Sequence, residues 1–187
     1  MNYIIIYAVL ISTCIGCSFN HQSSTSITYQ NKFSIEIPYG FEEEEHLKEG
    51  TILVFKNSKK NSILIVKSQD IENSYPDFIK KISSKQDMEN IRKSYFKSLA
   101  KNVKTKLFIH LSDTLKSLPP KKAIINNLNA FTGSFKATDK KKRNVYVNFG
   151  VLEGKKDYYT VFSITIQGIK NQYKEDIIKS INSFREL

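Results

Sequence analysis

Cysteine is missing from almost the whole chain, because the two cysteines, Cys14 and Cys17, both lie within the first 17 residues. The part that follows has no disulfide, no thiol nucleophile and no cysteine metal ligand. A domain without disulfides depends on its core for stability. A chain of 187 residues has room for one such domain, which can bury a single core, plus an N-terminal extra.

Charged side chains are absent before Lys32, although the chain contains 29 basic and 18 acidic residues. The net charge of +11 therefore belongs entirely to the remainder. Such a charge can attract phosphates or anionic lipid headgroups. The basic residues are scattered through turn-like positions, which favours the alternative that they are solvated surface residues.

An uncharged apolar run opens the chain at residues 3–11. It is shorter than the roughly 20 residues that a membrane-spanning helix needs. Its length, and the small residues that follow it, are typical of the apolar core of a signal peptide. The alternative is a buried N-terminal strand. A strand would be shorter than this run, and the polar segment that follows the run would then have no role.

The segment around the cysteines resembles the lipobox of bacterial lipoproteins, in which an aliphatic residue and two small or modest residues precede the lipidated cysteine. Ile15 and Gly16 suit the last two positions before Cys17, while Cys14 departs from the first. Thr13 is larger than the residue usually found before a lipidated cysteine, which disfavours Cys14. No Lys or Arg precedes the apolar run, which is a second departure. The resemblance implies lipidation at Cys17.

The sequence therefore predicts a signal peptide over 1–16, a lipidated N-terminus with a flexible tether over 17–26, and one domain over 27–187. The Ser-rich polar residues 18–26 are typical of a tether. Each buried methylene of an acyl chain such as palmitate adds about 0.8 kcal/mol, so a multiply acylated cysteine anchors firmly. We expect a membrane-anchored protein on the periplasmic or extracellular face of a bacterial envelope.

Apolar periodicity predicts the elements of the domain. Strands are expected at 27–30, 33–37, 51–55, 62–67, 107–111, 123–136, 145–149 and 159–166. Helices are expected at 76–82, 87–103 and 173–184. Short connections make neighbouring strands antiparallel, and amphipathic helices must cover sheet surface. The predicted fold class is α+β, an α/β/α sandwich around a mainly antiparallel sheet.

This layout resembles the PsbP-like superfamily. The resemblance rests on residues 33–41, which read FSIEIPYGF, on residues 128–130, which open a long strand, and on the closing strand and helix over 159–184. It implies an α/β/α sandwich with an accessory or binding role. It transfers no ligand site, because a shared fold is weak evidence for a shared function.

Metal ligands are sparse, since the three histidines, His21, His46 and His110, stand far apart and no HExxH motif is present. The glutamates at 42–45, with His46 and Glu49, could attract a hard cation. However, consecutive residues point in different directions and no glycine forms a ligand loop, which favours a solvated acidic face. We expect no metal and no cofactor.

Catalytic motifs are also missing, because the chain has no GxSxG and no Gly-rich phosphate loop. Ser163 lies within an expected strand as a sheet-surface residue. His110 and Asp113 would lie on opposite faces of a strand, so they do not form a catalytic pair. The basic run at 140–143 indicates a nucleic-acid patch or, more simply, a hairpin tip that follows Asp139. On a membrane-facing tip, each of its charges would contribute about 1 kcal/mol.

The sequence thus predicts a non-enzymatic binding or accessory module, anchored to the membrane through its lipid. We expect a monomeric domain with an envelope protein as partner and no contact with nucleic acid. Two alternatives stay open: an envelope hydrolase with an unrecognised site, and an immunity-type lipoprotein that binds a toxin.

The anchor gives the first testable prediction. Cys17→Ala should release the protein from the membrane fraction and abolish incorporation of labelled palmitate, because the acyl chains attach to that sulfur. Cys14→Ala should leave both unchanged. If Cys14→Ala has the stronger effect in metabolic labelling, the lipidated residue is Cys14.

Overall fold

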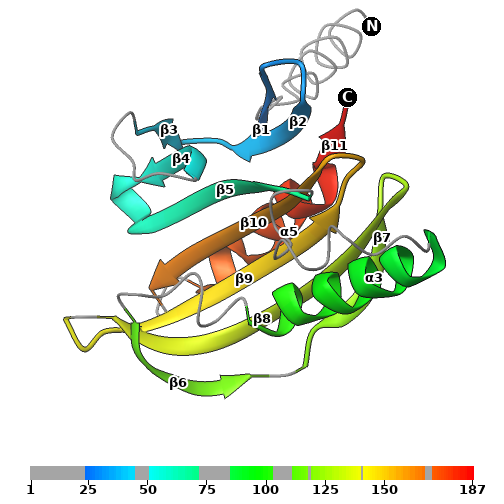
Figure 1. Ribbon diagram of the computed structural model, residues 1–187. Coiled ribbons are helices and arrows are strands. Elements are labelled where there is room, and N and C mark those ends of the chain that lie inside the picture. Colours follow the sequence, from blue (N-terminus) through cyan, green and yellow to red (C-terminus); the bar gives the residue numbers. More distant parts are fainter. Residues whose placement is uncertain are drawn as a thin grey trace, which may run out of the picture.

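The computed structural model describes residues 24–44, 51–71, 85–102, 111–117, 119–139, 141–166 and 170–187 (Figure 1). The signal peptide, Cys14, Cys17, the predicted helix at 76–82 and the histidines lie outside these residues. The predicted tether ends at residue 26, whereas the first described strand begins at Ser24.

Antiparallel strands form two sheets. The small sheet has the order β1-β2-β11, and the large sheet has the order β3-β4-β5-β10-β9-β8-β6, with β7 also paired to β8. The strands are β1 (Ser24–Tyr29), β2 (Phe33–Pro38), β3 (Glu42–Glu43), β4 (Thr51–Asn57), β5 (Ser62–Asp70), β6 (Leu111–Ser117), β7 (Lys121–Ile125), β8 (Leu128–Asp139), β9 (Asn144–Glu153), β10 (Asp157–Ile166) and β11 (Arg185–Glu186). The helices are η1 (Ser58–Lys60), α3 (Lys85–Lys101) and α5 (Lys170–Ser183).

The elements lie in layers around the large sheet. Figure 1 shows α3 on one face of this sheet and α5 on the other, with the small sheet beside α5. Two hydrophobic clusters match these faces: one joins Phe96 and Leu99 of α3 to the sheet, and the other joins Ile177 of α5 and Phe33 of β2 to it. The predicted α+β fold with a mainly antiparallel sheet is confirmed, and the separate small sheet is an addition.

Strands β9 and β10 are buried on both faces. Residues 145–152 and residues 158–163 are buried without interruption, so the apolar alternation at Val145, Val147 and Phe149 shows only one of the two covered faces. The other face of β9 packs under α5, where Gly150 lies against Ile181. The sheet needs cover from both helices for this reason.

The strand predicted over 123–136 is a hairpin. Strands β7 and β8 are joined by Asn126 and Asn127, which have φ values of 46° and 68°. Asparagine tolerates this left-handed conformation, which a two-residue hairpin turn requires. The Nδ2 group of Asn126 also donates to the carbonyl oxygens of Asn182 and Phe184, each at 2.9 Å. The turn is therefore tied to the end of α5.

Two boundaries differ from the sequence prediction. Helix α3 begins at Lys85, so Asp87 lies in its first turn instead of capping it. There its negative charge favours the helix dipole. Strand β6 begins at Leu111, where the strand predicted over 107–111 ends.

Close packing at Gly150 yields a prediction. A Cβ atom at this position would lie 2.6 Å from Cγ2 of Ile181, so Gly150→Ala should force α5 away from the sheet. We expect the free energy of unfolding, measured in urea, to fall by about 1–3 kcal/mol. Adding Ile181→Leu removes the Cγ2 methyl group that the new Cβ atom would meet. The double variant should therefore recover part of the lost free energy of unfolding. Simple additivity of the two changes would contradict this explanation.

Candidate functional site

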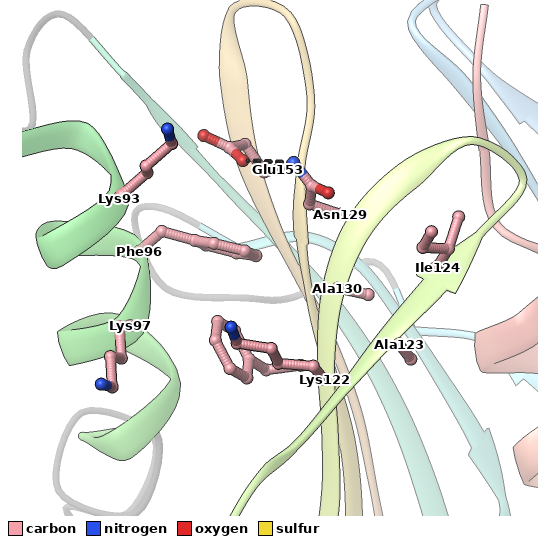
Figure 2. A pocket seen from close by; sticks show the side chains of 10 residues that line it. Lys93, Phe96, Lys97, Lys122, Ala123, Ile124, Asn129, Ala130 and Glu153 are labelled. Carbon is pink, nitrogen blue, oxygen red and sulfur yellow. Dashed lines mark hydrogen bonds between the residues drawn. The ribbon is translucent and has the colours of Figure 1, made fainter. Parts of the chain in front are cut away.

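An open cavity of about 540 Å³ lies between α3 and the β7–β8 hairpin (Figure 2). We call it the α3–β7 groove. Helix α3 supplies one wall and β7 the other, with β8 and the end of β9 between them. It is lined by Lys93, Phe96, Lys97, Lys122, Ala123, Ile124, Asn129, Ala130, Phe131 and Glu153.

The floor of the groove is apolar and well packed. The rings of Phe96 and Phe131 have centroids 5.1 Å apart, and Phe96 stacks on Tyr158 at 5.7 Å with 9° between the ring planes. All three side chains are buried. Packing from several sides fixes their positions, so the floor is a preformed surface.

One wall exposes a large apolar side chain. Ile124 of β7 is 77% exposed. In the β7–β8 register, Lys122 is opposite Phe131 and Ile124 is opposite Asn129, so these four side chains share the face of the sheet that looks toward α3. Ile124 therefore extends the apolar floor to the rim of the groove.

The carboxylate of Glu153 is held at one end of the groove. It accepts hydrogen bonds from Nε of Arg92 at 2.7 Å and from Nδ2 of Asn129 at 3.0 Å. Arg92 also donates to the carbonyl oxygen of Gly154 at 2.9 Å. Because both carboxylate oxygens have donors and one donor is a guanidinium, this charge is neutralised inside the protein.

Three lysines surround the opening. Lys93 pairs with Glu89 one turn earlier on α3, with 2.6 Å between Nζ and Oε1. Lys97 and Lys122 have no ion-pair partner within the described part of the chain. Figure 2 shows Lys122 reaching from β7 toward α3. The groove consequently combines an apolar floor with two lysines that have no ion pair among the described residues.

The sequence-predicted candidates lie elsewhere. Ser163 is in β10 as predicted, but it is fully buried, and its Oγ has no hydrogen-bond partner among the described residues. Ser163 is buried instead of lying on the sheet surface because α5 covers that face of β10. In the acidic run, Glu42 and Glu43 form β3, and Glu44 lies 3.5 Å from Nζ of Lys56. His46, Glu49 and His110 lie outside the described residues, and Asp113 is in β6.

The basic run forms the predicted hairpin tip between β8 and β9. Asp139 accepts hydrogen bonds from the backbone N–H groups of Lys141 and Arg143 and from Nε of Arg143. These donors, the backbone N–H of Arg143 first, lower the pKa of Asp139. In Figure 1 this tip and β1 lie at opposite ends of the domain.

The described residues contain neither a metal-binding cluster nor a membrane-spanning helix. No three His, Cys, Asp or Glu side chains lie close enough there to hold a metal ion. Among the helices of the same part, none has the length and apolar character to cross a membrane.

Sequence reasoning missed the groove residues, and one signal pointed to them. Arginine is rare in this Lys-rich chain and occurs at Arg92, Arg143 and Arg185. Its planar fork suits fixed pairing with carboxylates, and two of the three make such pairs here. The presence of Arg92 on a predicted helix therefore indicated a fixed ion pair with a carboxylate. Its partner, Glu153, is far along the chain.

Comparison with known proteins concerns the fold alone. No protein-family model matches the chain, and no curated protein matches it by sequence. The solution structure of CyanoP, the cyanobacterial PsbP of Synechocystis sp. PCC 6803, matches with a TM-score of 0.56 and 11% identity over 91% of this chain and 96% of that chain. The fold is PsbP-like.

Two further structures share this PsbP-like layout. LpqN of Mycobacterium tuberculosis matches with a TM-score of 0.51 and 6% identity, over 87% of this chain and 90% of that chain. A protein from Bacteroides thetaiotaomicron matches with a TM-score of 0.51 and 10% identity, over 88% of this chain but 49% of that chain.

The Arg92–Glu153 pair gives a prediction. Arg92→Gln leaves a carboxylate that is only 12% exposed without its cation, so the free energy of unfolding should fall by about 1–3 kcal/mol. Lys93→Gln is the matched control on the same helix. Its pair with Glu89 is exposed and should matter by less than about 1 kcal/mol. Equal losses in urea denaturation would contradict a special role for Arg92.

Proposed function

We propose that this protein is a non-enzymatic binding module of the bacterial cell envelope, anchored by a lipid on Cys17, and that the α3–β7 groove is its binding site. The observation that carries the proposal is the groove itself. Binding sites for small molecules are concave, mostly apolar and furnished with a few placed polar groups. A cavity of about 540 Å³ with an aromatic floor and charged rim has these properties.

The groove is better suited to binding than to catalysis. Its described lining contains no Ser, Thr, Cys or His. Its carboxylate, Glu153, is occupied by Arg92 and Asn129. A general base needs a free lone pair within reach of the substrate proton, and a nucleophile needs an adjacent base. Neither arrangement is present among the residues that line the groove.

The envelope location rests on the N-terminal sequence and on one neighbour. The lipobox-like segment ends at Cys17, and LpqN is described as involved in cell envelope biogenesis. Strand β1 begins at Ser24. Since an extended residue spans about 3.5 Å, the intervening segment can reach roughly 25 Å. A lipid on Cys17 would therefore keep the domain close to the bilayer.

Two variants test the binding site. The lipidated protein, purified in nanodiscs from its own bacterium, should carry a co-purifying molecule that native mass spectrometry detects. Ile124→Asp should lose that molecule, because the change adds a negative charge and removes an apolar contact at the rim. The side chain is 77% exposed, so the fold should tolerate the change.

Tyr39→Asp is the matched control. Like Ile124, Tyr39 is a large hydrophobic residue that is mostly exposed, at 73%, but it does not line the groove. It should retain the molecule. Equal retention by both variants would refute the groove as the binding site. Turnover of an envelope substrate that a single side-chain change abolishes would refute the non-enzymatic role.

A further inference from the structure

We propose that the α3–β7 groove binds an amphipathic anion, meaning an apolar chain that ends in a carboxylate or a phosphate. This inference rests on the proposed function, because it specifies the ligand of the same site. It follows from two properties of the groove, the shape of its apolar surface and the balance of charge around it.

The apolar part of the ligand is matched by a continuous surface. Phe96 and Phe131 form the floor, and Ile124 continues it to the rim. Covering an exposed isoleucine with another apolar group removes hydrocarbon from water, which is favourable in proportion to the area covered. A ligand without an apolar body would leave this surface exposed.

The charged part of the ligand is matched by the lysines. Two acids of the described residues near the groove are already paired, Glu153 with Arg92 and Glu89 with Lys93. Lys97 and Lys122 stand on opposite walls with no ion pair in the described part of the chain (Figure 2). An ammonium group is a flexible point charge that suits a carboxylate or phosphate head at a solvent-exposed rim.

The same charge balance argues against other ligand classes. A cationic amphiphile would meet two like charges, and like-charge contacts reduce affinity. A neutral amphiphile would satisfy the floor and leave the lysines unpaired. The head of the ligand should therefore lie between Lys97 and Lys122, with its chain over Phe96 and Phe131.

Photocrosslinking in a neutral bilayer tests the inference. The full lipidated chain in phosphatidylcholine nanodiscs is exposed to a dodecanoate that carries a diazirine in its chain, and to the matching dodecylamine and dodecanol probes. We expect the dodecanoate probe to label peptides that contain residues 93–97 and 122–131. The dodecanoate probe should label these peptides about tenfold more than the amine probe does, which is the scale of one well-placed charge contact.

Charge reversal provides the matched variants. Lys97→Glu combined with Lys122→Glu should reduce dodecanoate labelling by about tenfold or more. The control combines Lys59→Glu with Lys101→Glu, which changes two exposed lysines outside the groove. It has the same net charge as the double variant in the groove. The control should label like the unchanged protein. Circular dichroism verifies that both double variants are folded.

A competition experiment separates the two sources of such an anion. Displacement of the probe by free dodecanoate or dodecyl phosphate indicates a monomeric ligand, whereas displacement only by phosphatidylglycerol in the nanodisc indicates a bilayer lipid. Both results support the proposed chemistry. Equal labelling by the three probes, or labelling that survives charge reversal, overturns it. If Ile124→Asp still loses the native molecule in that case, the binding function stands and only the ligand class is wrong.

Discussion

Burial of the β9–β10 hairpin on both faces is the constraint on which the rest of the fold depends. A strand that is covered on both faces has few exposed polar positions, as residues 145–152 show. Water must be excluded from one face by α3 and from the other by α5 with the small sheet. Among the described residues, α3 and α5 are the helices that pack on the large sheet. The α3–β7 groove lies between α3 and the β7–β8 hairpin.

The turn that joins β9 to β10 is held from both sides. Arg92 of α3 binds Glu153 and the carbonyl oxygen of Gly154, while Glu186 of β11 accepts hydrogen bonds from the backbone N–H of Lys155 at 2.9 and 3.0 Å. Burial, with smaller contributions from the charges of Asp157 and Glu186, raises the pKa of Tyr159 to about 12. The neutral phenol is thereby retained in the core. The same Arg92 contact links α3 to this turn at one end of the groove.

The sequence predicted the fold better than the site, and the reason is the range of the interactions. Alternation in β2 and the helical stripe in α3 are local patterns, which a single segment displays. The hairpin turn at Asn126–Asn127 was not predicted within the strand expected over 123–136, because it lacks the glycine that usually marks such a turn. The groove requires residues from four elements. No local pattern in the sequence indicates that residues near 93, 122 and 153 lie close together. Ser163 was assigned to a strand, but its burial depended on the position of α5.

For the proposed ligand of the groove, the local charge matters more than the net charge of +11. Most lysines whose side chains the structure describes are exposed, and Arg92 and Arg143 are engaged in pairs. The hairpin tip at 141–143 lies at the opposite end of the domain from β1 (Figure 1). If a short tether holds β1 near the bilayer, this tip points away from the membrane and contributes little to lipid contact, because exposed charges are screened within about 8 Å at physiological salt. Of the three lysines beside the apolar cavity, Lys93 pairs with Glu89, whereas Lys97 and Lys122 have no ion pair among the described residues. The proposed ligand could contact both of these charges and the floor.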